Sequence, residues 1–144
     1  MTAHQDCVFC QIASGHLNAQ IVYEDDESFA FLDIQPLFPG HVLLCPREHY
    51  ETLTDLPPNL AGPMMVTTQM LARAVESAMD ADGTFIAVNN KVSQTVPHLH
   101  IHVVPRRRRD GLKGFFWPRV PYRDEAARAA VCDAIQREVQ KLLL

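Results

Sequence analysis

Three histidines at alternate positions form the clearest chemical signal in the sequence. Residues 96–105 read VPHLHIHVVP, so single apolar residues separate His98, His100 and His102. Because successive side chains of a β-strand point to opposite faces, a strand over this segment would place the three imidazoles on one face. Imidazole binds metal ions, relays protons and can attack phosphorus. The alternation therefore predicts a metal site or a catalytic row in preference to an ordinary solvent-facing strand.

A second group of candidate ligands lies near the N-terminus. Cys7 and Cys10 have the C-x-x-C spacing of one half of a zinc site or of a redox pair. We find no secretory signal and expect a cytoplasmic protein with reduced thiols, which argues against a structural disulfide. Cys45, in an apolar run, and Cys132, among alanines, are expected to be small core residues.

Composition restricts the class of protein. The chain has 144 residues, 47% of them hydrophobic and 21% charged, as expected for one soluble globular domain. The lack of a run of about 20 apolar residues argues against a membrane span, and the net charge of −4 argues against a nucleic-acid partner. The basic block Arg106–Arg109 is interpreted either as a solvated strand exit or as an attraction for phosphate. His4 and His16 are expected to be ordinary surface residues.

Apolar periodicity predicts an α+β fold. Strands are expected over residues 20–25, 28–34, 41–46, 84–90 and 96–105. One long helix would carry a mostly apolar face, with Pro63 in its first turn; the residues of that face are Leu60, Met64, Thr68, Leu71, Val75 and Met79. A second helix is expected over residues 124–144, with Asp124 as its cap and an apolar stripe. Strands before and after one long helix favour an antiparallel sheet of about five strands.

Several ordered landmarks resemble the histidine triad (HIT) family. QTVPHLHIHV resembles its His-x-His-x-His signature, and FLDI, PGH and P-x-x-H resemble its upstream landmarks. CVFCQIASG is similar to the N-terminus of the Hint-like bacterial branch. The resemblance implies a single HIT domain over residues 1–144, with a core of about 7–106 and a C-terminal extension of about 107–144. Ser93 stands where that branch usually has glycine. The Phe115–Trp117 segment is interpreted as core beneath the added helix, with Trp117 stacking on a base or on a peptide-like leaving group as the alternative.

The resemblance also implies a reaction and roles for individual residues. His100 would attack the α-phosphorus of a nucleotide and form a nucleotidyl-histidine that water hydrolyses, His102 would hold the phosphate, and His98 and His41 would orient the row. The expected nucleotide contacts are Asp33 at the ribose, Ile34, Phe9 and Phe31 at the base, and Asn89, Gln94 and Thr95 at the phosphates or leaving group.

A zinc ion and a set of substrates complete what the resemblance implies. Cys7, Cys10, His49 and His98 would form a closed, structural zinc site. The substrate would be a purine nucleotide conjugate, either a nucleoside phosphoramidate or a dinucleoside polyphosphate, and the protein would be a homodimer. Two alternatives stay open, namely a nucleotidyl phosphorylase and a nucleotide-binding regulator with little turnover.

Overall fold

The structure is a computed structural model that describes residues 4–113 and 118–143. It divides after Asp110 into two compact units, a larger N-terminal one and a smaller one from Gly111 onward. The interpretation of Phe115–Trp117 as core lies outside the described residues. No helix of the described part of the chain is long and apolar enough to cross a membrane.

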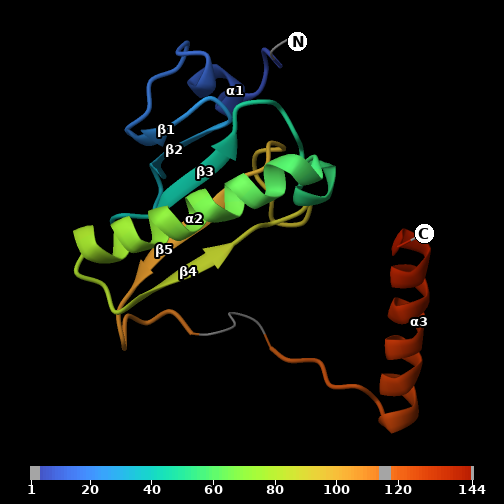
Figure 1. Ribbon diagram of the computed structural model, residues 1–144. Coiled ribbons are helices and arrows are strands. Elements are labelled where there is room, and N and C mark those ends of the chain that lie inside the picture. Colours follow the sequence, from blue (N-terminus) through green and yellow to red (C-terminus); the bar gives the residue numbers. More distant parts are fainter. Residues whose placement is uncertain (1–3, 114–117, 144) are drawn as a thin grey trace. The chain divides into compact units, whose positions relative to one another are not determined.

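A five-stranded antiparallel sheet forms the larger unit (Figure 1). Its strands lie in the order β1 (Ile21–Glu24), β2 (Ser28–Leu32), β3 (Val42–Pro46), β5 (Ile101–Arg106) and β4 (Gly83–Ala87). Neighbouring strands pair antiparallel throughout. The predicted α+β class and the predicted number of strands are therefore confirmed.

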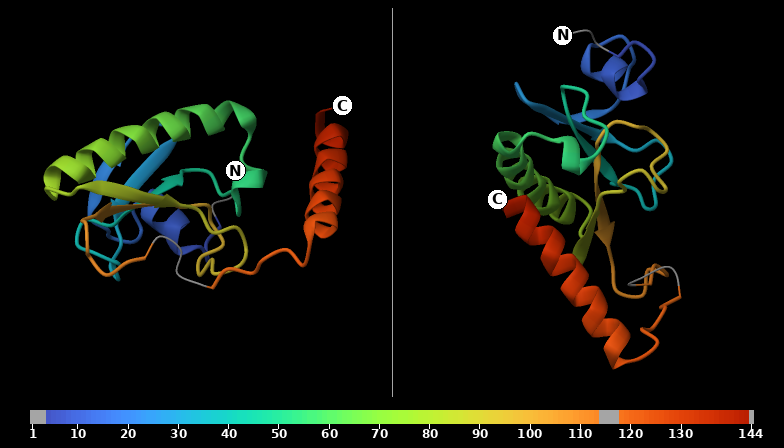
Figure 2. Two further views of the ribbon diagram at one scale, coloured as in Figure 1. Left: turned by 90° about the horizontal axis from the view of Figure 1, so that it is seen from below. Right: turned by 90° about the vertical axis from the view of Figure 1, so that its right-hand side faces the viewer.

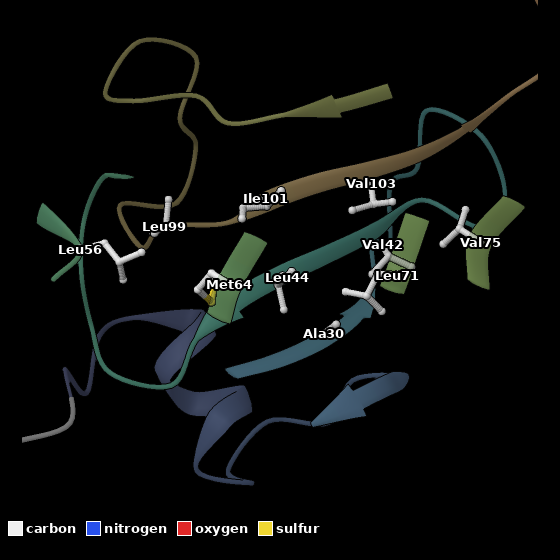
Figure 3. Packing of buried hydrophobic residues seen from close by; sticks show 10 residues of the cluster. All are labelled: Ala30, Val42, Leu44, Leu56, Met64, Leu71, Val75, Leu99, Ile101 and Val103. Carbon is white, nitrogen blue, oxygen red and sulfur yellow. The ribbon is translucent and has the colours of Figure 1, made fainter. Parts of the chain in front are cut away.

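One face of the sheet is covered by the long helix α2 (Pro58–Ala78), which packs on β3, β4 and β5 (Figures 1 and 2). Its buried residues are Met64, Thr68, Leu71 and Val75, which confirms the predicted apolar face. Ala30, Leu44, Ile101 and Val103 are among the sheet residues in the same core cluster (Figure 3). Pro63 lies inside the helix rather than in its first turn, because α2 already begins at Pro58.

The opposite face of the sheet carries the short helix α1 (Val8–Ala13) and a second, smaller core. Leu43 and Cys45 of β3 belong to this second core, whereas Val42 and Leu44 belong to the core under α2. This division follows from the two-residue period of a strand. The burial of Cys45 confirms its predicted core role.

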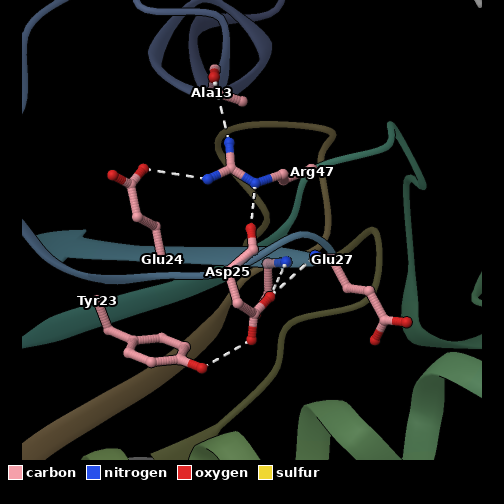
Figure 4. A network of polar contacts seen from close by, with 7 residues as sticks. Ala13, Tyr23, Glu24, Asp25, Glu27 and Arg47 are labelled. Carbon is pink, nitrogen blue, oxygen red and sulfur yellow. Dashed lines mark hydrogen bonds and ion pairs between the residues drawn. The ribbon is translucent and has the colours of Figure 1, made fainter.

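Arg47, which directly follows β3, fastens α1 to the sheet (Figure 4). Its guanidinium donates to the carbonyl of Ala13 at the end of α1 (3.4 Å) and to the Glu24 carboxylate of β1 (3.0 Å). It also donates to the carbonyl of Asp25 in the β1–β2 turn. One side chain therefore ties the helix that carries Cys10 to the first hairpin.

The histidine segment differs from its prediction in one respect. The strand β5 begins at Ile101, so only His102 of the three histidines lies on a strand. Pro97 has no N–H for a ladder, and the N–H of Leu99 donates to the carbonyl of Tyr50 in a loop (2.7 Å). The alternation of faces nevertheless persists, because Leu99, like Ile101, is buried in the core under α2.

The smaller unit contains the helix α3 (Glu125–Leu143). The Asp124 carboxylate accepts a hydrogen bond from the N–H of Ala127 (2.8 Å), which confirms the predicted cap. No residue of α3 within the described range is buried, and its apolar stripe, which includes Val131 and Ile135, is exposed. Cys132 is exposed too, so its predicted core role is wrong: it lies on a helix that has no core of its own.

Candidate functional site: a Cys2His2 cluster beside a histidine row

Two cysteines and two histidines from distant parts of the chain meet beside α1. Cys7 caps the N-terminus of α1, Cys10 lies in its first turn, His49 follows β3, and His98 precedes β5. One ligand atom from each of these four residues lies within 4.8 Å of the others. Nδ1 of His98 is 3.3 Å from Sγ of Cys7 and 3.5 Å from Sγ of Cys10, and Nδ1 of His49 is 3.4 Å from Sγ of Cys10.

These separations fit a tetrahedral zinc ion. Zinc bonds of about 2.3 Å to sulfur and about 2.0–2.1 Å to nitrogen place neighbouring sulfur and nitrogen ligands about 3.6 Å apart. Nε2–H of His98 donates to the carbonyl of Pro46 (2.8 Å), so a neutral His98 directs its Nδ1 lone pair at the two sulfurs. The four residues therefore form a candidate zinc site, and four protein ligands make such a site structural.

The electrostatics of the cluster favour a bound cation. Burial and the neighbouring Cys7 raise the pKa of Cys10 to about 11, so two thiolates are costly here without a positive charge. Burial lowers the pKa of His98 to about 4 and also lowers the pKa of His49. Both imidazoles are therefore neutral near pH 7, the state in which they bind metal.

A hydrogen-bond relay runs behind the histidine row. The N–H of Leu37 donates to Nδ1 of His41 (3.1 Å), and Nε2 of His41 lies 2.9 Å from Nδ1 of His102. Burial lowers the pKa of His41 and lowers that of His102 to about 4, so both rings are neutral near pH 7. Since Nδ1 of His41 accepts, its proton is on Nε2 and is donated to His102, which must then carry its own proton on Nε2.

The relay ends in an unsatisfied donor beside a second imidazole. Among buried side-chain nitrogen and oxygen atoms of the described residues, Nε2 of His102 is the one with no hydrogen-bond partner. The ring of His100 lies beside it, with centroids 4.9 Å apart. Nδ1–H of His100 donates to the carbonyl of His98 (2.8 Å), which leaves its Nε2 lone pair available. A nucleophilic nitrogen and an N–H donor thus lie side by side.

Some of the predicted nucleotide contacts lie close to this pair. A carboxylate oxygen of Asp33 is 3.7 Å from Nε2 of His41, and Ile34 beside it is 93% exposed. Phe9 is buried and packs edge-on against His100 (centroids 5.1 Å apart) and Phe31 (5.3 Å). The two phenylalanines therefore support the histidines as core residues, whereas Ile34 offers an open apolar surface.

The predicted phosphate loop is fastened through its own glutamine. The side-chain carbonyl of Gln94 accepts from the N–H of Lys91 (2.8 Å), and its amide donates to the carbonyl of Glu51 (2.6 Å). Lys91 and Ser93 adopt φ of 70° and 61°, a conformation that favours glycine. Ser93 thus keeps the glycine-like backbone at its position. Asn89 and Thr95 are exposed on this loop.

The basic block lies at the other end of β5 from the row (Figure 1). Arg106 pairs with Asp110 (2.6 Å), Arg107 donates to the carbonyl of Met79 just after α2, and the N–H of Arg108 donates to Asp82 before β4. These contacts support the interpretation of the block as a turn that leaves the strand.

Sequence reasoning missed the contact of His4 with His49. Its ring stacks on that of His49, with centroids 3.9 Å apart, although the residue is exposed as predicted. The only signal in the sequence is its position three residues before Cys7. His16 is exposed and bonds to Ser14 (2.7 Å), as befits a surface residue.

Comparison with known proteins identifies the family of the chain. A family model described as the HIT domain matches residues 14–109. The chain belongs to the histidine triad (HIT) family. It is 42% identical over 127 residues to an uncharacterised HIT-like protein of Mycobacterium tuberculosis, covering 85% of this chain and 88% of that one. It is also 38% identical over 113 residues to the adenylylsulfatase HINT3 of Arabidopsis thaliana, covering 77% of this chain and 57% of that one.

A solved structure agrees with both the fold and the metal cluster. A zinc-bound histidine triad protein from Mycobacterium smegmatis superposes with a TM-score of 0.71 and 40% identity, covering 92% of this chain and 97% of that one. The HIT fold is therefore confirmed, and the Cys2His2 cluster fits the zinc-containing branch of the family. Membership of the HIT family supports, in broad terms, a nucleotide hydrolase or transferase.

Proposed function

We propose that this HIT protein cleaves nucleotide conjugates at the α-phosphate through a nucleotidyl intermediate on His100. The observation that carries the proposal is the pairing of a free Nε2 lone pair on His100 with the unsatisfied Nε2–H of His102. Transfer of a nucleotidyl group needs a nucleophile for the phosphorus and a hydrogen-bond donor for the phosphate oxygens.

The first step forms one bond and breaks one. Nε2 of His100 attacks the α-phosphorus, a P–N bond forms, and the bond from phosphorus to the leaving group breaks with its electron pair. His102 donates to a phosphate oxygen as negative charge builds there. Water then adds to phosphorus, the P–Nε2 bond breaks, a proton is released, and a nucleoside monophosphate leaves with His100 restored.

The remaining positions surround the nucleotide. Asp33 accepts from ribose hydroxyls, which a carboxylate suits. The base lies over Ile34, above the buried Phe9 and Phe31. Further contacts to the phosphates or the leaving group come from Asn89, Gln94 and Thr95. One amide hydrogen of Gln94 donates to the carbonyl of Glu51, so Gln94 would donate its other amide hydrogen to the substrate.

The zinc site supports the row indirectly. Cys7, Cys10, His49 and His98 would hold the zinc ion, which would fix the ring of His98 in place. The carbonyl of the same residue accepts from Nδ1–H of His100, so it sets the tautomer of the nucleophile. His98 therefore positions His100 from the backbone while its side chain belongs to the metal cluster.

The leaving group is the open part of the proposal. Nucleoside phosphoramidates and dinucleoside polyphosphates are the first candidates. The relative named as an adenylylsulfatase adds adenylyl sulfate, whose α-phosphorus carries sulfate as the leaving group. Phosphate as the acceptor in place of water would make the enzyme a nucleotidyl phosphorylase.

A substrate panel on wild type and His100→Ala tests the proposal. We expect wild type to release AMP from at least one conjugate. A reaction with a conjugate labelled in its adenylyl group, quenched in alkaline denaturant because a P–N bond to imidazole survives base and not acid, should leave label on the protein. His100→Ala should lose both signals, whereas His16→Ala, an exposed control, should keep them. Turnover by His100→Ala at the wild-type rate would refute the nucleophile, and AMP binding without any turnover would favour the regulator. A nucleoside diphosphate formed with added phosphate would favour the phosphorylase.

We further propose a cytoplasmic homodimer with one HIT domain. The family match over residues 14–109 supports a core of about 7–106 and an extension of about 107–144. The outer face of α2 exposes Met65, Val66 and Met70, an apolar surface suited to a second copy. Light scattering should give twice the chain mass, and Val66→Asp should halve it.

A further inference from the structure

The segment before α1 lies against the metal cluster. His4 touches three of the four candidate ligand residues. Its carbonyl accepts from the N–H of Cys7 (2.9 Å), its backbone hydrogen-bonds to the Cys10 thiol and opposes the rise in that pKa, and its ring stacks on His49. The two stacked rings are 26° from parallel.

His4 is nevertheless not a fifth ligand in this arrangement. Two groups of possible ligand atoms within 4.8 Å of one another are found among the described residues, and neither includes His4; the one at this site holds Cys7, Cys10, His49 and His98. His4 contacts the ligand residues Cys7, Cys10 and His49 and is not itself a ligand. Residues that hold metal ligands in this way commonly change metal affinity 10- to 100-fold when they are replaced.

Two surface hollows reach the cluster, and His4 borders both. One, of about 470 Å³, is lined by Cys10 and His16 among others, and the second, of about 350 Å³, by Cys7 and His49. A small molecule that removes the metal must attack the ligands from one of these hollows. The ring of His4 covers a face of His49 that would otherwise be open to it.

We propose that the ring of His4 controls the release of the metal from the Cys7–Cys10–His49–His98 site by covering His49. The inference rests on the zinc site and not on the proposed reaction. His49 is the half-buried ligand of the four, so it is the ligand from which release begins. The stacked ring opposes the rotation that would take His49 off the metal.

Zinc transfer to a chromophoric chelator tests this in the full-length, zinc-loaded protein. We expect His4→Ala to release zinc about tenfold faster than wild type. His4→Phe keeps a flat ring and the backbone contacts and should release zinc within threefold of the wild-type rate. His16→Ala removes another exposed histidine from the same hollow without touching a ligand and should behave as wild type.

The other results decide against the proposal. Equal release from His4→Ala and wild type would show that the ring of His4 does not retain the metal. Release from His4→Phe as fast as from His4→Ala would refute the stacking account. Cobalt(II) absorption spectra provide the second measurement: the same tetrahedral bands in all variants are expected, and a changed ligand band in His4→Ala would make His4 a ligand instead. None of these measurements depends on turnover, so they stand if the proposed reaction fails.

Discussion

Replacing His41 should remove the hydrogen bond that keeps the proton of His102 on Nε2, the atom proposed to donate to the phosphate. The ring of His41 accepts from the N–H of Leu37 and donates to Nδ1 of His102, which leaves the proton of His102 on Nε2. His41→Phe keeps a ring in a site that is 3% exposed but removes both nitrogens. Nδ1 of His102 then has no donor, so the neutral ring is free to carry its proton on the wrong nitrogen.

The magnitude follows from the loss of the donor to Nδ1 of His102. A buried donor or acceptor without a partner costs about 1–3 kcal/mol, whereas the N–H of Leu37 belongs to an exposed residue and can bond to water, so the free energy of unfolding should fall by about 1–3 kcal/mol. Loss of one preorganised donor to developing charge costs about 10²–10³ in kcat. Because some His102 rings will still hold the proton on Nε2, we expect a fall in kcat of roughly 10- to 100-fold, with KM changed only a few-fold.

Two measurements check this, and one conservative variant serves as the control. Long-range ¹H–¹⁵N correlation spectra report the tautomer of His102 directly, and AMP release reports kcat. In His41→Gln the side-chain carbonyl can accept from Leu37 and the amide can donate to His102, so part of the lost rate should return. A wild-type His102 protonated on Nδ1, or an unchanged kcat in His41→Phe, would refute the relay.

Three further predictions concern stability. The pKa of His102 is lowered from 6.5 to about 4, so the native state binds fewer protons than the unfolded state between these values. The contribution of this ring to stability is full above pH 6.5 and should fall toward pH 4 by on the order of 1–2 kcal/mol, because solvent screens a ring that is only partly buried. Urea unfolding at several pH values should show a shallower acid loss in His102→Gln, and an identical slope would contradict this assignment. Metal analysis should find one zinc ion per wild-type chain. Removing the zinc with a chelator, or replacing Cys10 in Cys10→Ser, should lower Tm markedly. A Tm unchanged by the chelator would refute a structural role for the metal. Gly40→Ala should destabilise by about 1–3 kcal/mol, because φ is +98° and the new methyl would lie 2.6 Å from Met79. Gly62→Ala, at an open position of α2, should cost less in the same thermal assay; because Gly62 directly precedes Pro63, the usual gain of alanine over glycine in a helix is offset there.

Local sequence patterns were enough to predict much of the fold. The period-two strands and the three- and four-residue spacing on α2 are set by neighbours in sequence, and the structure confirmed both. The start of β5 was less readable, because the partner of Leu99 is the carbonyl of Tyr50 in a distant loop. Cys132 was misjudged for a related reason: an apolar stripe predicts an amphipathic helix but not what covers it.

By itself, the sequence determined the family, the order of the landmarks and the residue types available for chemistry. The alternation of histidines with Leu99, Ile101 and Val103 was enough to separate a chemical face from a core face, since apolar burial selects the side. What only the tertiary structure decided is how the imidazoles differ from one another. The protons of three rings are placed by backbone groups that no side-chain pattern reveals: Leu37 N–H behind His41, Pro46 carbonyl at His98, and His98 carbonyl at His100. The proton of His102 is placed in turn by His41. The contact of His4 with His49 likewise joins segments that are 45 residues apart, and only the folded chain brings them together.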